Sequence, residues 1–168
     1  GFGVMGVPLA GHLAARGRAV AVCTRRRARA GAWVATHGGQ MAPTPAEAAK
    51  GAELVFTCVG NDADLSAVVT GADGAVAGMD KDAILIDHTT TSADIARNLS
   101  AQRAAQSLHM LDAPVSGGQA GAENGALTIM VGGPPKVFDT AQPILMHYAR
   151  AARLMGAAGA GQLTTMVN

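Results

Sequence analysis

The chain has 168 residues, of which 49% are hydrophobic and 15% are charged, so it can bury a core without a disulfide or a structural metal. Its 13 Lys and Arg residues nearly balance 12 Asp and Glu residues, and a net charge of +1 gives no general attraction to nucleic acid or to an anionic membrane. No apolar run approaches the roughly 18 residues that cross a bilayer, so we expect a soluble, cytoplasmic protein.

The chain opens with a glycine-rich hexapeptide that is followed by a helix. Gly1-Phe2-Gly3-Val4-Met5-Gly6 matches the G-x-G-x-x-G pattern, whose glycines permit a tight turn and let backbone N–H groups approach a pyrophosphate. A helix is predicted over Pro8 to Arg16, because Leu9 and Leu13 lie one turn apart and Gly17 ends the pattern. The strand that normally precedes such a loop would lie before residue 1, so we expect the first strand to be missing. The expected cofactor contacts in this loop are Gly1, Gly3, Val4, Met5 and Gly6.

A short apolar run, Ala19 to Cys23, predicts the next strand, buried on both faces. The run ends in Thr24-Arg25-Arg26-Arg27, where a dinucleotide-binding domain contacts the adenosine ribose. NAD-preferring domains usually carry Asp or Glu there, whereas guanidinium groups bind a 2′-phosphate through charge-assisted hydrogen bonds. Thr24, Arg25 and Arg26 therefore favour NADP over NAD, and Arg27 is assigned to the start of a helix. A nucleic-acid patch is not favoured, because no aromatic residues lie between the arginines.

Helices and strands alternate through the middle of the chain. Helices are predicted at about 26–36, 45–50 and 92–103, with Ser92 as an N-cap, and strands at 40–42, 53–59, 83–87 and 108–111. This alternation predicts a Rossmann-type α/β fold, a doubly wound and mostly parallel sheet with helices on both faces. Two of the strands lead into polar loops, Val59-Gly60-Asn61 and Asp87-His88-Thr89-Thr90, at the carboxyl edge where such sheets bind ligands.

The last third predicts strands at 126–131 and 153–155, a helix at 135–148 and the start of another helix near Gly161. We therefore expect residues 1–160 to form the cofactor-binding domain and residues 161–168 to begin an interdomain helix. Before them, Asp112 to Gly118 is a predicted strand end with Pro, Ser and two glycines. Such a turn exposes N–H groups and a hydroxyl that suit an anion, although an ordinary turn has the same composition.

Four segments, in order, resemble the β-hydroxyacid dehydrogenase family, which includes 3-hydroxyisobutyrate dehydrogenase and tartronate semialdehyde reductase. They are the opening glycine loop with Met5, Thr24-Arg25, Asp112 to Gly118 continuing to Gly125, and Gly159-Ala160-Gly161-Gln162. The third segment is the most specific, and the resemblance extends over essentially the whole chain.

The resemblance implies an NADP-dependent oxidoreductase that interconverts a small β-hydroxy acid and its semialdehyde or keto acid. It implies that Ser116, Gly117 and Gly118 hold the substrate carboxylate, that Val59, Gly60 and Asn61 line the cofactor and that Thr90 contacts its nicotinamide side. It also implies a second, all-helical domain, through which the full-length form is a homo-oligomer. Because that domain completes the active site, we expect these residues alone to show little or no turnover.

One position departs from the family pattern. Family members carry a lysine after the Gly-x-Gly-Gln turn and an asparagine three residues later, whereas this chain has Thr165 and Asn168. The lysine donates a proton, a contribution typically worth roughly 10²–10⁴-fold in rate, and a threonine hydroxyl is not a comparable acid. His88 is interpreted as a packed histidine rather than a replacement acid. Two alternatives therefore remain: a catalytically silent NADP-binding relative, and a relative of the imine reductases whose acid lies elsewhere.

Overall fold

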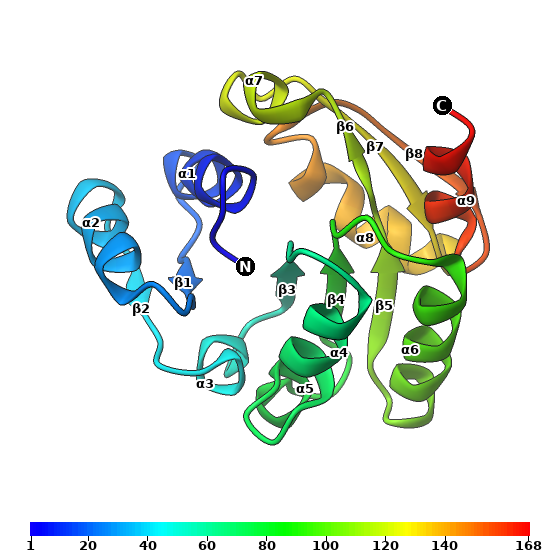
Figure 1. Cartoon of the computed structure of the whole chain (residues 1–168), viewed down its shortest axis with the longest axis horizontal. Helices are drawn as coiled ribbons and strands as arrows, with labels where there is room; N and C mark the ends of the chain where they lie inside the picture. Colours follow the sequence, from blue (N-terminus) through cyan, green and yellow to red (C-terminus); the bar gives the residue numbers. More distant parts are fainter.

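The computed structural model describes residues 1–168, and its helices lie on both faces of a central sheet (Figure 1). The strands are β1 (Ala21–Val22), β2 (Gln40–Met41), β3 (Leu54–Thr57), β4 (Ile84–Asp87), β5 (His109–Asp112), β6 (Val115–Ser116), β7 (Leu127–Gly132) and β8 (Ala149–Gly156). The helices are α1 (Gly6–Ala15), α2 (Arg27–His37), α3 (Pro45–Ala49), α4 (Asp62–Thr70), α5 (Ala75–Gly78), α6 (Ala93–Ala105), α7 (Gly118–Glu123), α8 (Pro135–Leu145) and α9 (Ala160–Met166). This architecture confirms the predicted Rossmann-type α/β class.

The main sheet has six strands. Five of them follow the order β3-β4-β5-β7-β6, and the sixth, β8, pairs with the remaining edge of β7. β3, β4 and β5 are parallel and in register, whereas β7 runs antiparallel to both β5 and β6. The sheet is therefore mostly parallel, as predicted. Its register places Thr57, Asp87 and Asp112, the last residues of three neighbouring strands, side by side at one edge.

The apolar residues of β4 explain why helices cover both faces. Ile84 and Ile86 pack on one side into a core that also contains residues of α1 and α8, whereas Leu85 packs on the other side with residues of α4 and α6. All three side chains are at most 4% exposed. A continuous apolar run is what a strand needs when it is buried on both faces.

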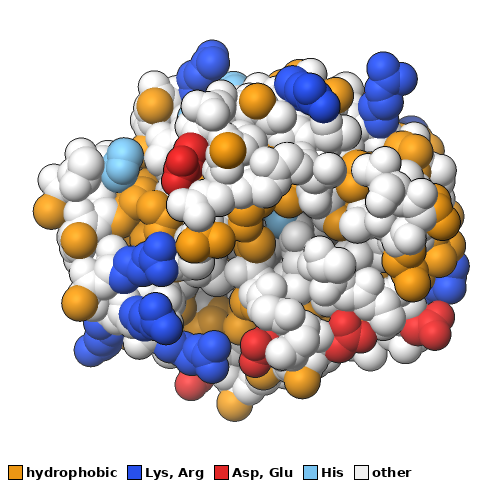
Figure 2. Space-filling model, turned by 45° about the horizontal axis from the view of Figure 1, so that its top comes forward, with side chains coloured by type: hydrophobic (Ala, Val, Ile, Leu, Met, Phe, Trp, Pro, Cys, Tyr) orange, Lys and Arg blue, Asp and Glu red, His pale blue; other side chains and the backbone are white.

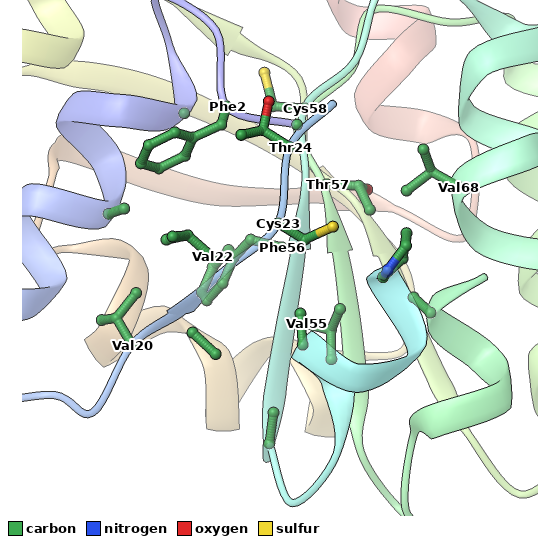
Figure 3. Close-up of a pocket in the computed structure, with 18 of the residues that line it drawn as sticks. Phe2, Val20, Val22, Cys23, Thr24, Val55, Phe56, Thr57, Cys58 and Val68 are labelled. Atoms are coloured by element: carbon green, nitrogen blue, oxygen red, sulfur yellow. The ribbon is translucent and has the colours of Figure 1, made fainter. Parts of the chain in front are cut away.

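The sheet is interrupted between β1 and β3. β1 pairs only with β2, and the edge of β3 that faces β1 has no hydrogen-bonded strand. A cleft of about 2330 Å³, here called the interstrand cleft, lies between them. Val22 and Cys23, from β1 and the residue after it, and Val55 and Phe56, from β3, are among the residues that line it (Figure 3). The prediction that 19–23 is a strand buried on both faces is wrong, because Ala21 is exposed where β1 has no second neighbour.

Other differences from the predicted elements concern helices that begin in polar or glycine-rich segments. The polar loop Val59-Gly60-Asn61 leads directly into a helix that was not predicted, since Asn61 caps α4 by accepting a hydrogen bond from the Asp64 N–H at 2.8 Å. The glycines after Ser116 lead into α7, and the helix predicted to reach residue 148 ends at Leu145. Ser92 is the N-cap of α6, as predicted. No helix has the length and hydrophobicity that a membrane span requires.

Candidate cofactor and substrate site

The carboxyl edge of the sheet carries a pocket of about 300 Å³ at which four predicted segments meet. Met5 comes from the glycine loop, Val59 and Gly60 follow β3, Thr90 follows β4, and Gly118 follows β6. The other residues that line the pocket are Cys58, His88, Thr89 and Val115. The structure thus brings together residues that lie more than 100 positions apart, at the edge where open α/β sheets bind ligands.

The glycine loop has the geometry expected of a phosphate-binding turn. A Cβ atom on Gly6 would collide with the carbonyl oxygen of Gly1, so close packing requires glycine at this position. A Cβ atom on Gly3 would meet no protein atom within 4 Å, so the protein itself leaves space beside this residue. The loop leads directly into α1, whose N-terminal N–H groups favour an anion. These residues fit the pyrophosphate of a dinucleotide.

The predicted ribose-contacting residues lie on the same side of the molecule as the glycine loop. Thr24, Arg25 and Arg26 line the interstrand cleft together with Gly1 and Gly6. Both arginines are exposed, and the only side-chain hydrogen bond in this segment runs from the Arg26 N–H to Thr24 Oγ1 at 3.3 Å. Figure 2 shows a group of Lys and Arg side chains at its lower left, beside hydrophobic side chains that surround a hollow. The guanidinium groups are therefore accessible to a phosphate.

His88 lies beneath the pocket and is a packed residue, as predicted. Its Nδ1 contacts the Ala113 carbonyl oxygen at 2.6 Å and its Nε2 contacts the Tyr148 hydroxyl at 2.8 Å. The side chain is 3% exposed, and this burial lowers the pKa of His88 from 6.5 to about 4. A neutral ring donates from Nδ1 to the carbonyl and accepts at Nε2 from Tyr148. His88 is thus held in one orientation and is not a free acid.

Asp87, the last residue of β4, is a buried carboxyl group to which the sequence assigned no role beyond its place in the polar loop that follows β4. Its Oδ1 accepts hydrogen bonds from Thr57 Oγ1 at 2.8 Å and from the Thr89 N–H at 3.1 Å, whereas its Oδ2 has no partner. Burial raises the pKa of Asp87 from 3.8 to about 6. The group connects the ends of β3 and β4 and fixes the start of the Thr89–Thr90 loop.

The predicted substrate segment forms a bend between β5 and α7. Ser116 is exposed in β6, and Gly117 and Gly118 follow with φ angles of 128° and 60°, a region that favours glycine. Gly118 lines the pocket, whereas Ser116 and Gly117 do not. The segment therefore lies next to the pocket and presents backbone N–H groups at the start of α7.

The two predicted catalytic positions are Thr165, on α9, and Asn168, just after its end, and neither lines the pocket. The Thr165 hydroxyl is buried without a hydrogen-bond partner, and Asn168 is exposed beyond the end of the helix. Gln162, the last residue of the Gly159–Gln162 segment, is 1% exposed and contacts both β5 and the Thr89–Thr91 loop. The motif drew attention to Gln162, but only the fold shows what its side chain contacts.

Comparison with known proteins agrees with this geometry. Residues 1–167 match the family model described as the NAD binding domain of 6-phosphogluconate dehydrogenase. An uncharacterized oxidoreductase of Shewanella frigidimarina is 56% identical over 168 residues, which are 100% of this chain and 58% of that protein. The chain therefore spans less than two thirds of the length of this relative.

Solved structures show the same fold. Mycobacterium tuberculosis 3-hydroxyisobutyrate dehydrogenase with L-serine has a TM-score of 0.93 and 32% identity, covering 100% of this chain and 56% of its own. Psf3 in complex with NADP+ and 2-OPP has a TM-score of 0.94 and 27% identity, covering 100% and 59%. A Streptomyces aurantiacus imine reductase has a TM-score of 0.88 and 26% identity, covering 100% and 58%.

Proposed function

The chain belongs to the family of the NAD-binding domain of 6-phosphogluconate dehydrogenase, and from this premise we propose that it is the NADP-binding part of a β-hydroxyacid dehydrogenase. The full-length enzyme would interconvert a small β-hydroxy acid and its semialdehyde or keto acid. The observation that carries the proposal is the convergence of the glycine loop, the Thr90 loop and Gly118 on one pocket at the carboxyl edge of the sheet.

The residues of this chain have distinct parts in the proposed reaction. The glycine loop and the N-terminus of α1 bind the cofactor pyrophosphate, and Arg25 and Arg26 bind the 2′-phosphate of NADP. The bound nicotinamide supplies the hydride for the carbonyl carbon. Thr90 is proposed to orient it, and Ser116, Gly117 and Gly118 are proposed to hold the substrate carboxylate through their N–H groups and hydroxyl.

The reduction also needs a group that donates a proton to the developing alkoxide. Thr165 stands where the family has lysine, and a threonine hydroxyl does not ionise near neutral pH. Two further candidates follow: a silent NADP-binding relative, in which Thr165 records the loss of the acid, and an imine-reductase-like enzyme, in which the acid is another group. The structural likeness to an imine reductase supports the imine-reductase-like candidate.

The decisive experiment measures NADPH-dependent reduction of succinic and tartronate semialdehydes by the full-length protein and by its Thr165→Lys variant. Turnover by the threonine form supports the dehydrogenase and excludes the silent relative. Turnover that appears only with lysine supports the silent relative. Activity with cyclic imines, but with neither aldehyde, favours the imine-reductase-like candidate. A titration in which NADPH binds no more tightly than NADH would contradict the proposed NADP preference.

The proposal includes parts of the protein outside these residues. The facing free edges of β1 and β3 leave room for one further strand, which we propose precedes residue 1 and joins the two sheets. Leu163, Met166 and Val167 are apolar but 46%, 73% and 87% exposed. We propose that a helical domain covers them, and that the full-length protein is a cytoplasmic homo-oligomer formed through that domain. Residues 1–160 would then form the cofactor domain and 161–168 would begin the interdomain helix. Hydrogen exchange of the full-length protein would test this, because β1, β3 and α9 should be protected there.

A further inference from the structure

The first turn of α9 is attached to the sheet by two buried polar side chains. Asp112, at the end of β5, is 2% exposed, and its Oδ1 accepts a hydrogen bond from the Gly159 N–H at 2.7 Å. Its Oδ2 accepts another from the Gln162 N–H at 3.1 Å. The carboxylate therefore satisfies N–H groups that a helix start leaves without partners.

The side chain of Gln162 continues this connection to the loop after β4. Its Oε1 accepts from the Thr91 N–H at 3.1 Å, and its Nε2 donates to the Thr89 carbonyl oxygen at 2.7 Å. These two bonds lie on either side of Thr90, which lines the pocket. Thr89 in turn accepts at Oγ1 from the Val59 N–H at 3.0 Å, so the loop after β3 is part of the same chain of contacts. We call Asp112, Gln162 and the Thr89–Thr91 backbone the α9 clamp.

Close packing leaves α9 little freedom to move within the clamp. A Cβ atom on Gly161 would lie 2.8 Å from the Asp112 carbonyl oxygen. A Cβ atom on Gly132 would lie 2.9 Å from the Ala160 nitrogen. Glycine at both positions lets the helix approach β5 and β7 closely, and the hydrogen bonds of the clamp then set its rotation about its own axis.

An amide satisfies both neighbours of the Gln162 side chain without a change of protonation. The Thr91 N–H needs an acceptor and the Thr89 carbonyl needs a donor, and glutamine supplies both in one planar group. A carboxylate in this place would offer no donor and would face the Thr89 oxygen, and a thioether would leave both backbone groups without strong partners.

We propose that Gln162 is a positioning residue, which fixes the placement of Thr165 on α9, and of Asn168 just after it, relative to Thr90 in the Thr89–Thr91 loop. The effect that we expect on catalysis rests on the proposed function. The effect that we expect on the placement of α9 rests on the contacts alone. Gln162 does not reach the pocket, so it acts through the two segments that it joins.

The test compares full-length Gln162→Met and Gln162→Glu with Gln106→Met, a matched control at an exposed glutamine without a side-chain hydrogen bond. In the Gln162 variants we expect kcat for NADPH-dependent aldehyde reduction to fall about tenfold to a hundredfold, as a displacement near 1 Å produces. We expect the Kd of NADPH to change much less than kcat, because the glycine loop and the arginines that hold its phosphates lie outside the α9 clamp. A merely structural defect would weaken both together. Gln162→Glu keeps the side-chain volume and decides the question if Gln162→Met does not fold.

Amide hydrogen exchange of the same proteins separates this inference from the proposed function. We expect faster exchange in the segments 89–91 and 160–166 of the Gln162 variants, with no change in β7. If the unaltered protein reduces no aldehyde, the proposed function fails, and the exchange pattern alone decides whether the clamp exists. Exchange and kcat that both match the Gln106→Met control would overturn the inference.

Discussion

Polar side chains at the ends of β4 and β5 are buried and hydrogen-bonded to other residues of the fold, whereas the arginine side chains that follow β1 are exposed to solvent. Asp87, His88 and Asp112 are at most 3% exposed, and each accepts or donates hydrogen bonds within the fold. Arg25 and Arg26 are exposed and have no side-chain partner in the protein. The first region fixes the geometry of the loops around the pocket, and the second offers charge to an anion. Substitutions should therefore affect stability in the first region and cofactor choice in the second.

Asp112→Ala should have the largest effect on stability. It leaves the buried N–H groups of Gly159 and Gln162 without an acceptor, and hydrogen bonds to a charged group contribute about 1.5–3 kcal/mol each. We expect the free energy of unfolding to fall by about 4 kcal/mol in urea denaturation of the full-length protein. Asp94→Ala is the control, because its side chain is 87% exposed and a surface change should cost under about 0.5 kcal/mol. Equal losses in the two variants would contradict the comparison.

The pH dependence of stability should show two opposing contributions from the buried region. Because the pKa of His88 is lowered from 6.5 to about 4, its contribution is complete above pH 6.5 and is lost as the pH falls toward 4. Because the pKa of Asp87 is raised from 3.8 to about 6, its contribution is complete below pH 3.8 and is lost as the pH rises through 6.

Removing one of these two groups should leave the other group's contribution to the pH dependence of stability visible. In Asp87→Asn we expect the unfolding free energy to decrease by up to ~3 kcal/mol as the pH is lowered through the His88 window, since each pKa unit corresponds to about 1.4 kcal/mol. In His88→Phe it should instead increase as the pH is lowered through the Asp87 window. Urea denaturation at several pH values measures both slopes, and the same slope in the two variants would contradict the assignment.

Replacing His88 should also leave a polar group without a partner in the core. His88→Phe keeps an aromatic ring near Phe56, 6.0 Å from it between ring centroids, but leaves the Tyr148 hydroxyl unpaired at 0% exposure. We expect a loss of about 2 kcal/mol at neutral pH. The double variant His88→Phe/Tyr148→Phe should recover part of that loss, because both partners are then apolar. Additive losses in a double-mutant cycle would show that the two groups do not interact.

Arg25→Ala and Arg26→Ala should have the smallest energetic effect, and it should appear in binding rather than folding. We expect each to weaken NADPH binding about tenfold, equivalent to about 1.4 kcal/mol, and to leave NADH binding and the unfolding free energy unchanged. Fluorescence titration with both cofactors measures the difference. Arg27→Ala, in the first turn of α2, is the control. Equal weakening of NADPH and NADH would mean that the arginines do not contact a 2′-phosphate.

The fold class and most strands were predictable, because buried parallel strands such as β4 are short apolar runs with polar ends. β8 was predicted only over residues 153–155, because its buried residues, Ala149 and Ala152, lie three positions apart and do not give the period-two pattern of a half-buried strand. α4 was missed because Asn61 and Asp62 have the composition of a turn, although the same residue types cap helices. Composition alone does not distinguish these two uses.

The sequence by itself determined the features that depend on local spacing: the glycine loop, the arginines after β1, the segment from Asp112 to Gly118 and the threonine at the lysine position. Each is a short run whose chemistry is complete within a few residues. Only the tertiary structure decided which side chains meet across the fold. Gln162 bonds to Thr91 over 71 residues of sequence, and His88 bonds to Tyr148 over 60. Such pairs follow from the packing of α9 against the sheet and the pairing of β8 within it, which no local pattern encodes.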